Sequence, residues 1–225
     1  MPDKPVTIAI DDVELRLDGT RVWLRADGER LELNLRTIGE QAAQDALAGI
    51  QSSLSAGSSL NAAIELAEAA VPQRWRMEAT TIDRGITIIN DAHDATKDGM
   101  AAALRSLAQL VPAGSRSVAV LGEFTSDPRD FVEEHDAIGR LVVRLNVGKL
   151  VAVGHGARHL QSAAGLEGSW DGESVIVDTP EEAYDLLRDE IRQNDVVLVK
   201  SAAGLGPLGD RLAGLADGET AVIAW

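Results

Sequence analysis

The chain has 225 residues, of which 45% are hydrophobic and 25% charged, a balance typical of a globular protein with a sizeable core. Its formal net charge of −15 argues against nucleic acid as a partner, because such a surface needs Lys and Arg to neutralise phosphates. The absence of cysteine excludes disulfide scaffolds and zinc–thiolate sites, and no apolar run approaches the roughly 18 residues of a membrane span, so we expect a cytoplasmic protein with neither signal peptide nor membrane partner.

The first part of the chain carries two successive patterns. Four stretches within residues 6–35 alternate between apolar and polar side chains, with breaks at Asp18-Gly19 and Asp27-Gly28, which predicts an antiparallel meander with tight turns. After residue 38 the apolar spacing predicts two helices separated by Gly57-Ser-Ser. Two helices are few for covering a meander, so we expect an exposed apolar patch around Trp23 and Trp75 that marks another domain, a protein partner or a dimer contact.

Beyond Pro72 predicted strands alternate with helices. The strands are near-continuous apolar runs at residues 86–89, 117–121, 150–153, 175–177 and 196–199, with a further edge strand at 221–224. The helices between them include 99–110, 135–145 and 181–192. Strands that are apolar on both faces indicate a parallel sheet covered on both sides.

The predicted fold class is therefore α/β. A Rossmann-like, mostly parallel sheet with helices on both faces occupies residues 81–225. It is preceded by a small antiparallel β-meander plus two helices in residues 1–80. We expect the boundary between the two parts near residues 72–84.

A glycine pattern follows the last long strand. Residues 204–209 read G-x-G-x-x-G, which is the form of a dinucleotide-binding fingerprint. That fingerprint normally opens a βαβ unit, with an acidic residue about 20 positions later at the end of the next strand. Here Glu219 precedes the final strand and Pro207 lies inside the loop, so we interpret the glycines as a sharp turn from strand to helix. NAD or another small ligand at this sheet edge is the alternative.

Several motifs occur in one order along the second part of the chain. They are Arg76-Met-Glu78, Gly85-Ile-Thr-Ile-Ile-Asn-Asp-Ala92, Asp98-Gly-Met100, Val120-Leu-Gly-Glu123, Glu134-His-Asp-Ala-Ile-Gly139, Leu150-Val-Ala-Val-Gly154 and Asn194-Asp-Val-Val-Leu-Val-Lys200. In this order and spacing they resemble the C-terminal half of the Mur ligase family, most closely its MurF branch of the actinobacterial type. The resemblance covers residues 72–215 well and residues 39–70 more loosely.

This resemblance implies a place in peptidoglycan synthesis. Residues 1–80 would be the tail of a central ATPase domain, and residues 81–225 a whole C-terminal domain. In the family reaction a carboxylate of the UDP-muramoyl peptide attacks the γ-phosphate of ATP, with Mg as cofactor, and an incoming amine attacks the acyl phosphate. The C-terminal domain would present that amine, here D-alanyl-D-alanine, and close over ATP to exclude water.

Three residues match functional positions of the family. Asp91 matches the acid that faces the ATP ribose, Arg76 matches a hinge arginine that reaches the nucleotide, and Lys200 matches a lysine near the incoming dipeptide. Each also has a structural interpretation: Asp91 as the cap of the following turn, Arg76 as a solvated hinge charge, and Lys200 as a lysine leaving a buried strand for solvent. No residue is assigned a catalytic or metal-binding role. His155 and His159 have a spacing that suits a metal, but we interpret them as surface histidines.

The chain departs from the family at its nucleotide motifs. No G-x-x-x-x-G-K-[ST] loop occurs in the sequence, so nothing in it cradles β- and γ-phosphates, and we do not expect this chain alone to catalyse ligation. Asp45 and Asp94 stand where the family has asparagines, and a carboxylate near a polyphosphate repels it by about 1 kcal/mol or more. These degenerate motifs argue against retained ATP binding.

Two functions stay open, with a third as a weaker possibility. The first is a portion of a MurF-like ATP-dependent ligase that works together with the missing ligase domains. The second is a stand-alone pseudo-ligase that binds a protein partner through the surface of residues 1–80. The third is a nucleotide-binding regulator that uses the loop at residues 204–209.

Overall fold

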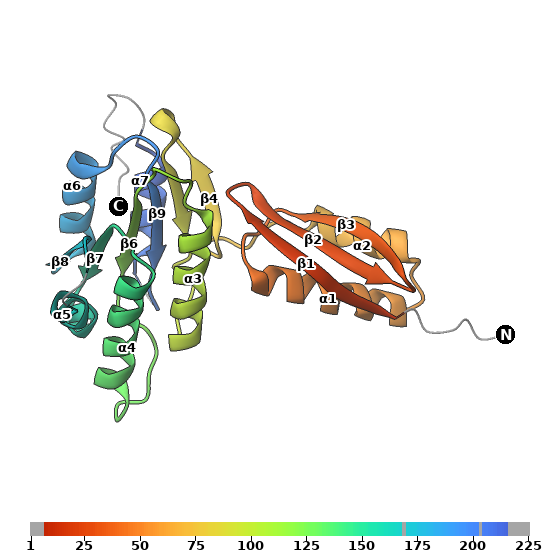
Figure 1. The fold of residues 1–225 in the computed structure, drawn as a ribbon, viewed down its shortest axis with the longest axis horizontal. Coiled ribbons are helices and arrows are strands. Elements are labelled where there is room, and N and C mark those ends of the chain that lie inside the picture. The colour runs from red at the N-terminus through yellow and green to blue at the C-terminus, as the bar shows by residue number, and fades with distance from the viewer. Residues whose placement is uncertain (1–6, 168–169, 203, 216–225) are drawn as a thin grey trace. The chain divides into compact units, whose positions relative to one another are not determined.

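A computed structural model describes residues 7–167, 170–202 and 204–215. The chain divides between Gln73 and Arg74 into two compact units, which are described one at a time (Figure 1). The predicted edge strand at residues 221–224 lies outside the described residues. In the part of the chain that the structure describes, no helix is long and apolar enough to cross a membrane.

The first unit is a three-stranded antiparallel sheet with two helices. Its elements are β1 (Ile8–Arg16), β2 (Gly19–Ala26), β3 (Glu29–Leu35), α1 (Glu40–Ser55) and α2 (Leu60–Ala69), and the strand order is β1-β2-β3. The β2–β3 turn consists of Asp27 and Gly28, whose φ angles are 47° and 94°. Two successive positive φ angles are what a two-residue hairpin turn of the Asn/Asp-Gly kind requires, so the predicted meander and this turn are confirmed.

β1 is one continuous strand, although its sequence suggested two stretches. The pairing with β2 shifts register between Ile10 and Asp12, which is a β-bulge. Because the bulge inserts one residue, Ile10 and Val13 both pack on the core of this unit. That core lies between the sheet and the helices and includes Val22, Leu24, Leu33, Ala43, Ile50 and Ala63.

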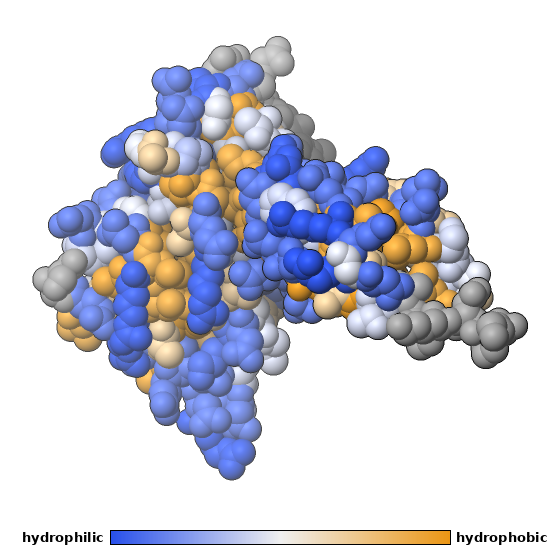
Figure 2. Space-filling view, turned by 45° about the vertical axis from the view of Figure 1, so that its right-hand side comes forward, coloured by the Kyte–Doolittle hydropathy of each residue, from blue (hydrophilic) through white to orange (hydrophobic). Residues whose placement is uncertain are grey.

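The outward face of the three-stranded sheet is charged and not apolar. Arg21 and Arg30 stack over Trp23 at 5.8 and 5.0 Å, and Asp11 pairs with both Arg25 and Arg30. The apolar patch expected around Trp23 is therefore wrong for this face, because the arginine side chains cover the indole. Hydrophilic side chains gather over much of this unit in Figure 2. The exposed large apolar side chains of its described part are Leu66 and Val71.

The second unit is the α/β part. Its elements are β4 (Glu78–Thr81), β5 (Thr87–Asn90), α3 (Lys97–Leu110), β6 (Ser117–Leu121), α4 (Phe131–Arg144), β7 (Lys149–Val153), α5 (Arg158–Leu166), β8 (Glu173–Val177), α6 (Pro180–Glu190), β9 (Val196–Lys200) and α7 (Gly206–Ala213). The sheet order is β4-β5-β9-β6-β7-β8. All neighbouring strands are parallel except β4, which is antiparallel to β5. The Rossmann-like, mostly parallel fold predicted from the sequence is confirmed.

β4 is the strand that the sequence did not reveal. It is short and mostly exposed, with the sequence Glu-Ala-Thr-Thr, so it lacks the apolar run that marks the other strands. Its pairing with β5 explains why the structural division falls after Gln73, inside the range of residues 72–84 expected from the sequence and before residue 80, where the first part was taken to end.

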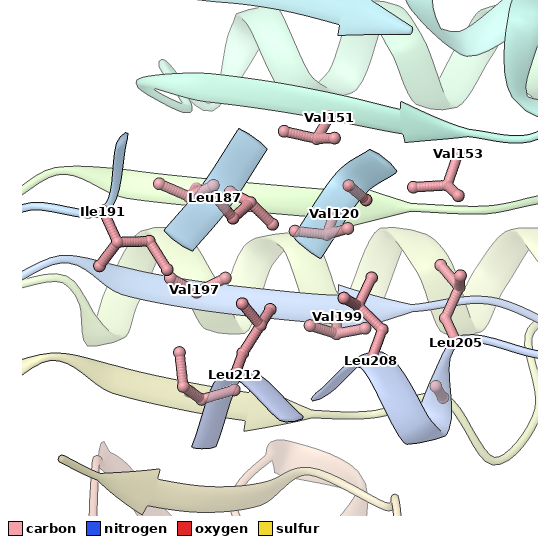
Figure 3. Packing of buried hydrophobic residues seen from close by; sticks show 14 of the residues in the cluster. Val120, Val151, Val153, Leu187, Ile191, Val197, Val199, Leu205, Leu208 and Leu212 are labelled. Atoms are coloured by element: carbon pink, nitrogen blue, oxygen red, sulfur yellow. The ribbon is translucent and has the colours of Figure 1, made fainter. Parts of the chain in front are cut away.

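Helices cover both faces of the six-stranded sheet. On one face, alternate strand residues such as Val120, Val151 and Val197 pack against α6 and α7 (Figure 3). Strand residues of the opposite parity, such as Ala119, are equally buried and face the side occupied by α3, α4 and α5. Capping explains where several helices begin: Thr96 accepts a hydrogen bond from Gly99 N at the start of α3, and Thr179 accepts one from Glu182 N before α6.

The strand order determines where functional side chains meet. β9 lies between β5 and β6 although it is the last strand along the described residues. The loops after β5, β6, β7 and β9 therefore gather at the carboxyl edge of one sheet, which is where open parallel sheets bind ligands.

Candidate functional site

Asp91 and Lys200 form a buried ion pair at this carboxyl edge. Lys200 Nζ lies 2.5 Å from Asp91 Oδ2, and the two side chains are 4% and 14% exposed. Burial raises the pKa of the Asp91 carboxyl, although the Lys200 ammonium opposes that shift. Two of the sequence-predicted site residues are thus in direct contact.

The geometry overturns the structural interpretations of both residues. Lys200 does not leave its strand for solvent, because its ammonium is enclosed and also donates to the backbone carbonyls of Asp91, at 3.4 Å, and Asp94, at 3.2 Å. The hydrogen bonds of Asp91 do not cap the following turn. Its Oδ1 accepts from Met77 N at 3.1 Å, so both carboxylate oxygens have protein donors.

Arg76 lies between two residues with left-handed backbone geometry. Trp75 and Met77 have φ angles of 61° and 48°, values that bulky residues rarely adopt. Arg76 Nη2 pairs with Asp94 Oδ2 at 2.9 Å, and its Nε is buried without a hydrogen-bond partner. Arg76 is thus a half-exposed guanidinium already engaged with a carboxylate. The Asp94 charge that stands in place of a family asparagine is compensated by Arg76, and His93 Nδ1 lies 3.3 Å from the same carboxylate oxygen.

Asp210 anchors the same segment from α7. It accepts hydrogen bonds from Arg74 Nη2 at 2.7 Å, Trp75 Nε1 at 3.0 Å and Asn90 Nδ2 at 3.2 Å. The indole of Trp75 in turn covers Gly206. Trp75 is therefore packed within the second unit, and it does not contribute to the apolar surface expected from the sequence.

An open cleft of about 380 Å³ lies at the same edge of the sheet. Four loops line it, those after β6, β7, β8 and β9, through Gly122, Glu123, Val153, Gly154, His155, Gly156, Asp178, Pro180, Ser201, Ala202, Gly204 and Leu205. None of these described lining residues is Lys or Arg. Two carboxylates and an imidazole therefore make the polar chemistry of the cleft suitable for a ligand with an ammonium group.

Close approaches between loops shape this cleft. A Cβ on Gly156 would meet Glu123 Oε2 at 1.9 Å, and one on Gly122 would meet Ser201 Oγ at 2.5 Å. The Glu123 carboxylate thus lies directly against the backbone that precedes α5, and a side chain at position 156 would displace it. From the sequence, Glu123 was noted only as part of the Val120-Leu-Gly-Glu123 motif, and Asp178 was not predicted to be a site residue. The available signal was an acidic residue within two positions of the end of a parallel strand, β6 for Glu123 and β8 for Asp178.

The G-x-G-x-x-G pattern is a strand-to-helix turn, as interpreted from the sequence. Gly204 has a φ of 83°, and Gly206 and Gly209 belong to α7. A Cβ on Gly206 would meet the Trp75 ring at 2.4 Å, and one on Gly209 would meet the Asn90 side chain at 2.3 Å. Two of the glycines therefore serve close packing, while Gly204 lines the cleft.

The histidines of this unit show no arrangement for a metal. Within the described residues no group of three or more His, Cys, Asp or Glu side chains could hold a metal ion. His155 Nδ1 faces Arg158 Nη2 at 3.3 Å, and His159 Nδ1 lies 3.9 Å from Asp136 Oδ1. His135 is fully buried and stacked between Phe124 and Phe131, and burial lowers the pKa of its imidazole.

The mostly parallel sheet and the cleft at its carboxyl edge define a Rossmann-like α/β domain with a candidate ligand site. Residues 75–203 match the family model described as Mur ligase, glutamate ligase domain, and the chain belongs to the Mur ligase family. The resemblance read from the motif order is thereby confirmed.

Two of the most similar curated proteins are ligases of one kind within this family. The chain is 40% identical over 199 residues to the UDP-N-acetylmuramoyl-tripeptide–D-alanyl-D-alanine ligase of Mycobacterium leprae, covering 81% of this chain and 38% of that protein. It is 39% identical over 211 residues to the ligase of the same name from Mycobacterium tuberculosis, covering 85% and 41%. The chain thus spans about two fifths of the length of these relatives.

Solved structures share the fold. MurF from Acinetobacter baumannii superposes with a TM-score of 0.78 at 22% identity, over 96% of this chain and 46% of that one. MurF from Thermotoga maritima, solved in complex with ADP, gives a TM-score of 0.71 at 15% identity, over 87% and 43%. The second unit of the chain is accordingly a MurF-like Mur ligase C-terminal domain.

Proposed function

We propose that this chain supplies the dipeptide-binding and nucleotide-closing part of a MurF-like ATP-dependent ligase of peptidoglycan synthesis in the cytoplasm. The similar mycobacterial proteins are D-alanyl-D-alanine ligases by name, and the observation that carries the proposal is the cleft at the carboxyl edge of the sheet. In this proposal residues 1–80 are the tail of the central ATPase domain, and the missing ligase domains supply the phosphate-binding loop.

The cleft favours the incoming dipeptide as its ligand. D-alanyl-D-alanine carries an ammonium group, and Glu123 and Asp178 provide carboxylates to bind it. A carboxylate beside an amine is also suited to take the proton that the amine must lose before it attacks an acyl phosphate. The volume of about 380 Å³ is in the range of small-ligand sites.

Arg76 and Asp91 are the residues proposed to face the nucleotide. The half-exposed Arg76 guanidinium would move from Asp94 to a phosphate oxygen, since both are anionic partners of the same geometry. Asp91 would accept from ribose hydroxyls through lone pairs that its present donors leave free. ATP and Mg are bound in this proposal only by the complete enzyme, because this chain has no phosphate-cradling loop.

Titration of this chain with D-alanyl-D-alanine tests the proposal. The amide resonances of Gly122, Gly154 and Ser201 should shift on addition of the dipeptide. The variant Glu123→Gln should weaken the interaction at least tenfold, while Glu133→Gln, on the first turn of α4 and outside the cleft, should not. An absence of shifts at saturating dipeptide, or equal effects of the two variants, would contradict the proposal.

The competing proposal is a stand-alone pseudo-ligase that binds a protein partner through residues 1–80. The altered motifs favour it, since Asp45 and Asp94 replace amides that family members use near the nucleotide. Reading the gene upstream of Met1 separates the two ideas. A continuous frame with a G-x-x-x-x-G-K-[ST] loop supports the ligase and eliminates the pseudo-ligase.

A further inference from the structure

Lys200 ends β9 at the point where the loop after β5 crosses it. Its ammonium has three donors, and three oxygens surround it: Asp91 Oδ2, the Asp91 carbonyl and the Asp94 carbonyl. The side chain is 4% exposed. An ammonium enclosed in this way has no donor left for a ligand in the cleft, so direct contact with a dipeptide is not the role that its geometry favours.

Asp91, the partner of Lys200, and the loop that follows it also form hydrogen bonds with the strained segment around Arg76. Asp91 Oδ1 accepts from Met77 N, and His93 N donates to the Trp75 carbonyl at 3.0 Å. Trp75 and Met77 are the two residues with left-handed φ angles. Such conformations cost about 1–2 kcal/mol each outside glycine and persist only when the surroundings hold them.

We propose that Lys200 is a positioning residue that holds Asp91 and the loop after β5, and through them the strained Trp75–Met77 segment that presents Arg76. This deepens the proposed function, because Arg76 and Asp91 are the residues assigned to the nucleotide. The inference concerns contacts within the protein and is tested without any ligand.

The burial of the Asp91–Lys200 ion pair explains why losing Lys200 should open the loop. Removing the ammonium leaves the Asp91 carboxylate buried without a counter-charge, which is far more costly than the absence of both charges. Opening of the loop after β5 then becomes more favourable, because it lets water solvate the Asp91 carboxylate. Opening the loop breaks two hydrogen bonds together, from Met77 N to Asp91 Oδ1 and from His93 N to the Trp75 carbonyl, because Asp91 and His93 both belong to that loop.

Amide hydrogen exchange of the 225-residue chain tests the proposal with a matched control. Lys200→Met should accelerate exchange at the amides of Met77 and His93 at least tenfold relative to amides of β6 and β7. Lys149→Met removes an equally buried ammonium, paired with Glu173 and Glu190 at the opposite end of the strands. Because Lys149 belongs to β7, β6 serves as the reference for this control, and the exchange rate of the Met77 amide relative to β6 amides should stay unchanged.

The double variant Asp91→Asn with Lys200→Met should restore most of the protection, since an amide oxygen still accepts from Met77 N and no charge is stranded. Unchanged amide exchange in Lys200→Met would overturn the proposal, and so would the same local acceleration in Lys149→Met. If the double variant exchanges as fast as Lys200→Met alone, Lys200 does not act through the charge of Asp91, which also contradicts the proposal. Should Lys200→Met fail to fold, the wild-type chain suffices: the Lys200 ammonium protons should exchange slowly enough to be observed by NMR, and a rapidly exchanging ammonium would overturn the inference.

Discussion

Buried charges of the second unit occur as pairs at both ends of the sheet. At the carboxyl end Lys200 pairs with Asp91, residues that are 109 positions apart in sequence. At the amino end Arg116 pairs with Asp195, whose side chain is 1% exposed. Sequence reasoning singled out Asp91 and Lys200 separately, but it did not predict their contact, because only the placement of β9 beside β5 brings them together.

Asp195→Ala should destabilise the protein by about 3 kcal/mol or more. The substitution leaves Arg116 without its carboxylate, and stranding one member of a buried pair is strongly destabilising. It also removes the acceptor of Arg192 N, which lies 2.8 Å from Asp195 Oδ2. Urea denaturation measures the change. The exposed Asp189, paired with Arg188, is the control, and its substitution by Ala should hardly move the midpoint.

His135 should make stability fall in mildly acidic solution. Burial lowers the pKa of its imidazole in the folded state, so below about pH 6.5 the unfolded chain takes up a proton that the folded chain does not bind. This contribution is complete above about pH 6.5 and is lost as the pH falls toward the folded pKa.

The free energy of unfolding at about pH 7.5 and 5.5 measures this effect. His135→Leu should be less stable at the higher pH, because it loses the contacts to Phe124 N and Phe131 O. It should nevertheless show a smaller loss of stability between the two pH values than the wild type. An equal or larger loss would contradict the assignment to His135.

At the scale of elements, glycines decide how closely neighbouring segments pack. α4 approaches α5 at Gly139, where a Cβ would lie 2.2 Å from the Leu160 carbonyl oxygen. The sequence predicted the existence of α4 from its periodicity, but periodicity does not indicate which glycine in a helix meets a neighbour.

Gly139→Ala should destabilise the protein by about 1–3 kcal/mol, because overpacking outweighs the gain of about 1 kcal/mol in helix propensity. Gly165→Ala is the matched control on α5, since its Cβ would meet other atoms only at 3.9 Å. Thermal or urea unfolding should show it neutral or slightly stabilised. Equal effects of the two variants would show that propensity alone governs both positions.

Gly206→Ala should also destabilise the protein, by about 1–3 kcal/mol. Its Cβ would meet the Trp75 ring at 2.4 Å, so the ring has to move away from Asp210. The near-ultraviolet circular dichroism of the tryptophans should change together with the stability. A stable variant with an unchanged spectrum would show that the Trp75 packing is loose.

At the scale of the whole molecule, the two units have separate cores. One core belongs to the three-stranded sheet with α1 and α2, and the other to the six-stranded sheet with its helices. The contacts within the chain cluster on either side of Gln73, so each unit is compact by itself.

Residues 74–225 should therefore fold when expressed alone. We expect a cooperative thermal transition, and amide resonances for the cleft residues at positions close to those of the full chain. Residues 1–73 should be only marginally stable alone, because a unit of this size buries a small core. Circular dichroism of both pieces checks this, and a non-cooperative 74–225 would contradict it.

The sequence by itself determined the class of fold, the order of most elements and the family, since hydrophobic period, turn residues and motif order are local properties of the chain. It also indicated that the glycines after β9 form a turn. Tertiary structure alone decided that Lys200 is enclosed by Asp91 and a loop backbone, that Trp23 is covered by arginines, and that four loops form one cleft. These facts depend on which strands lie side by side, and strand order arises from contacts between segments far apart in the sequence.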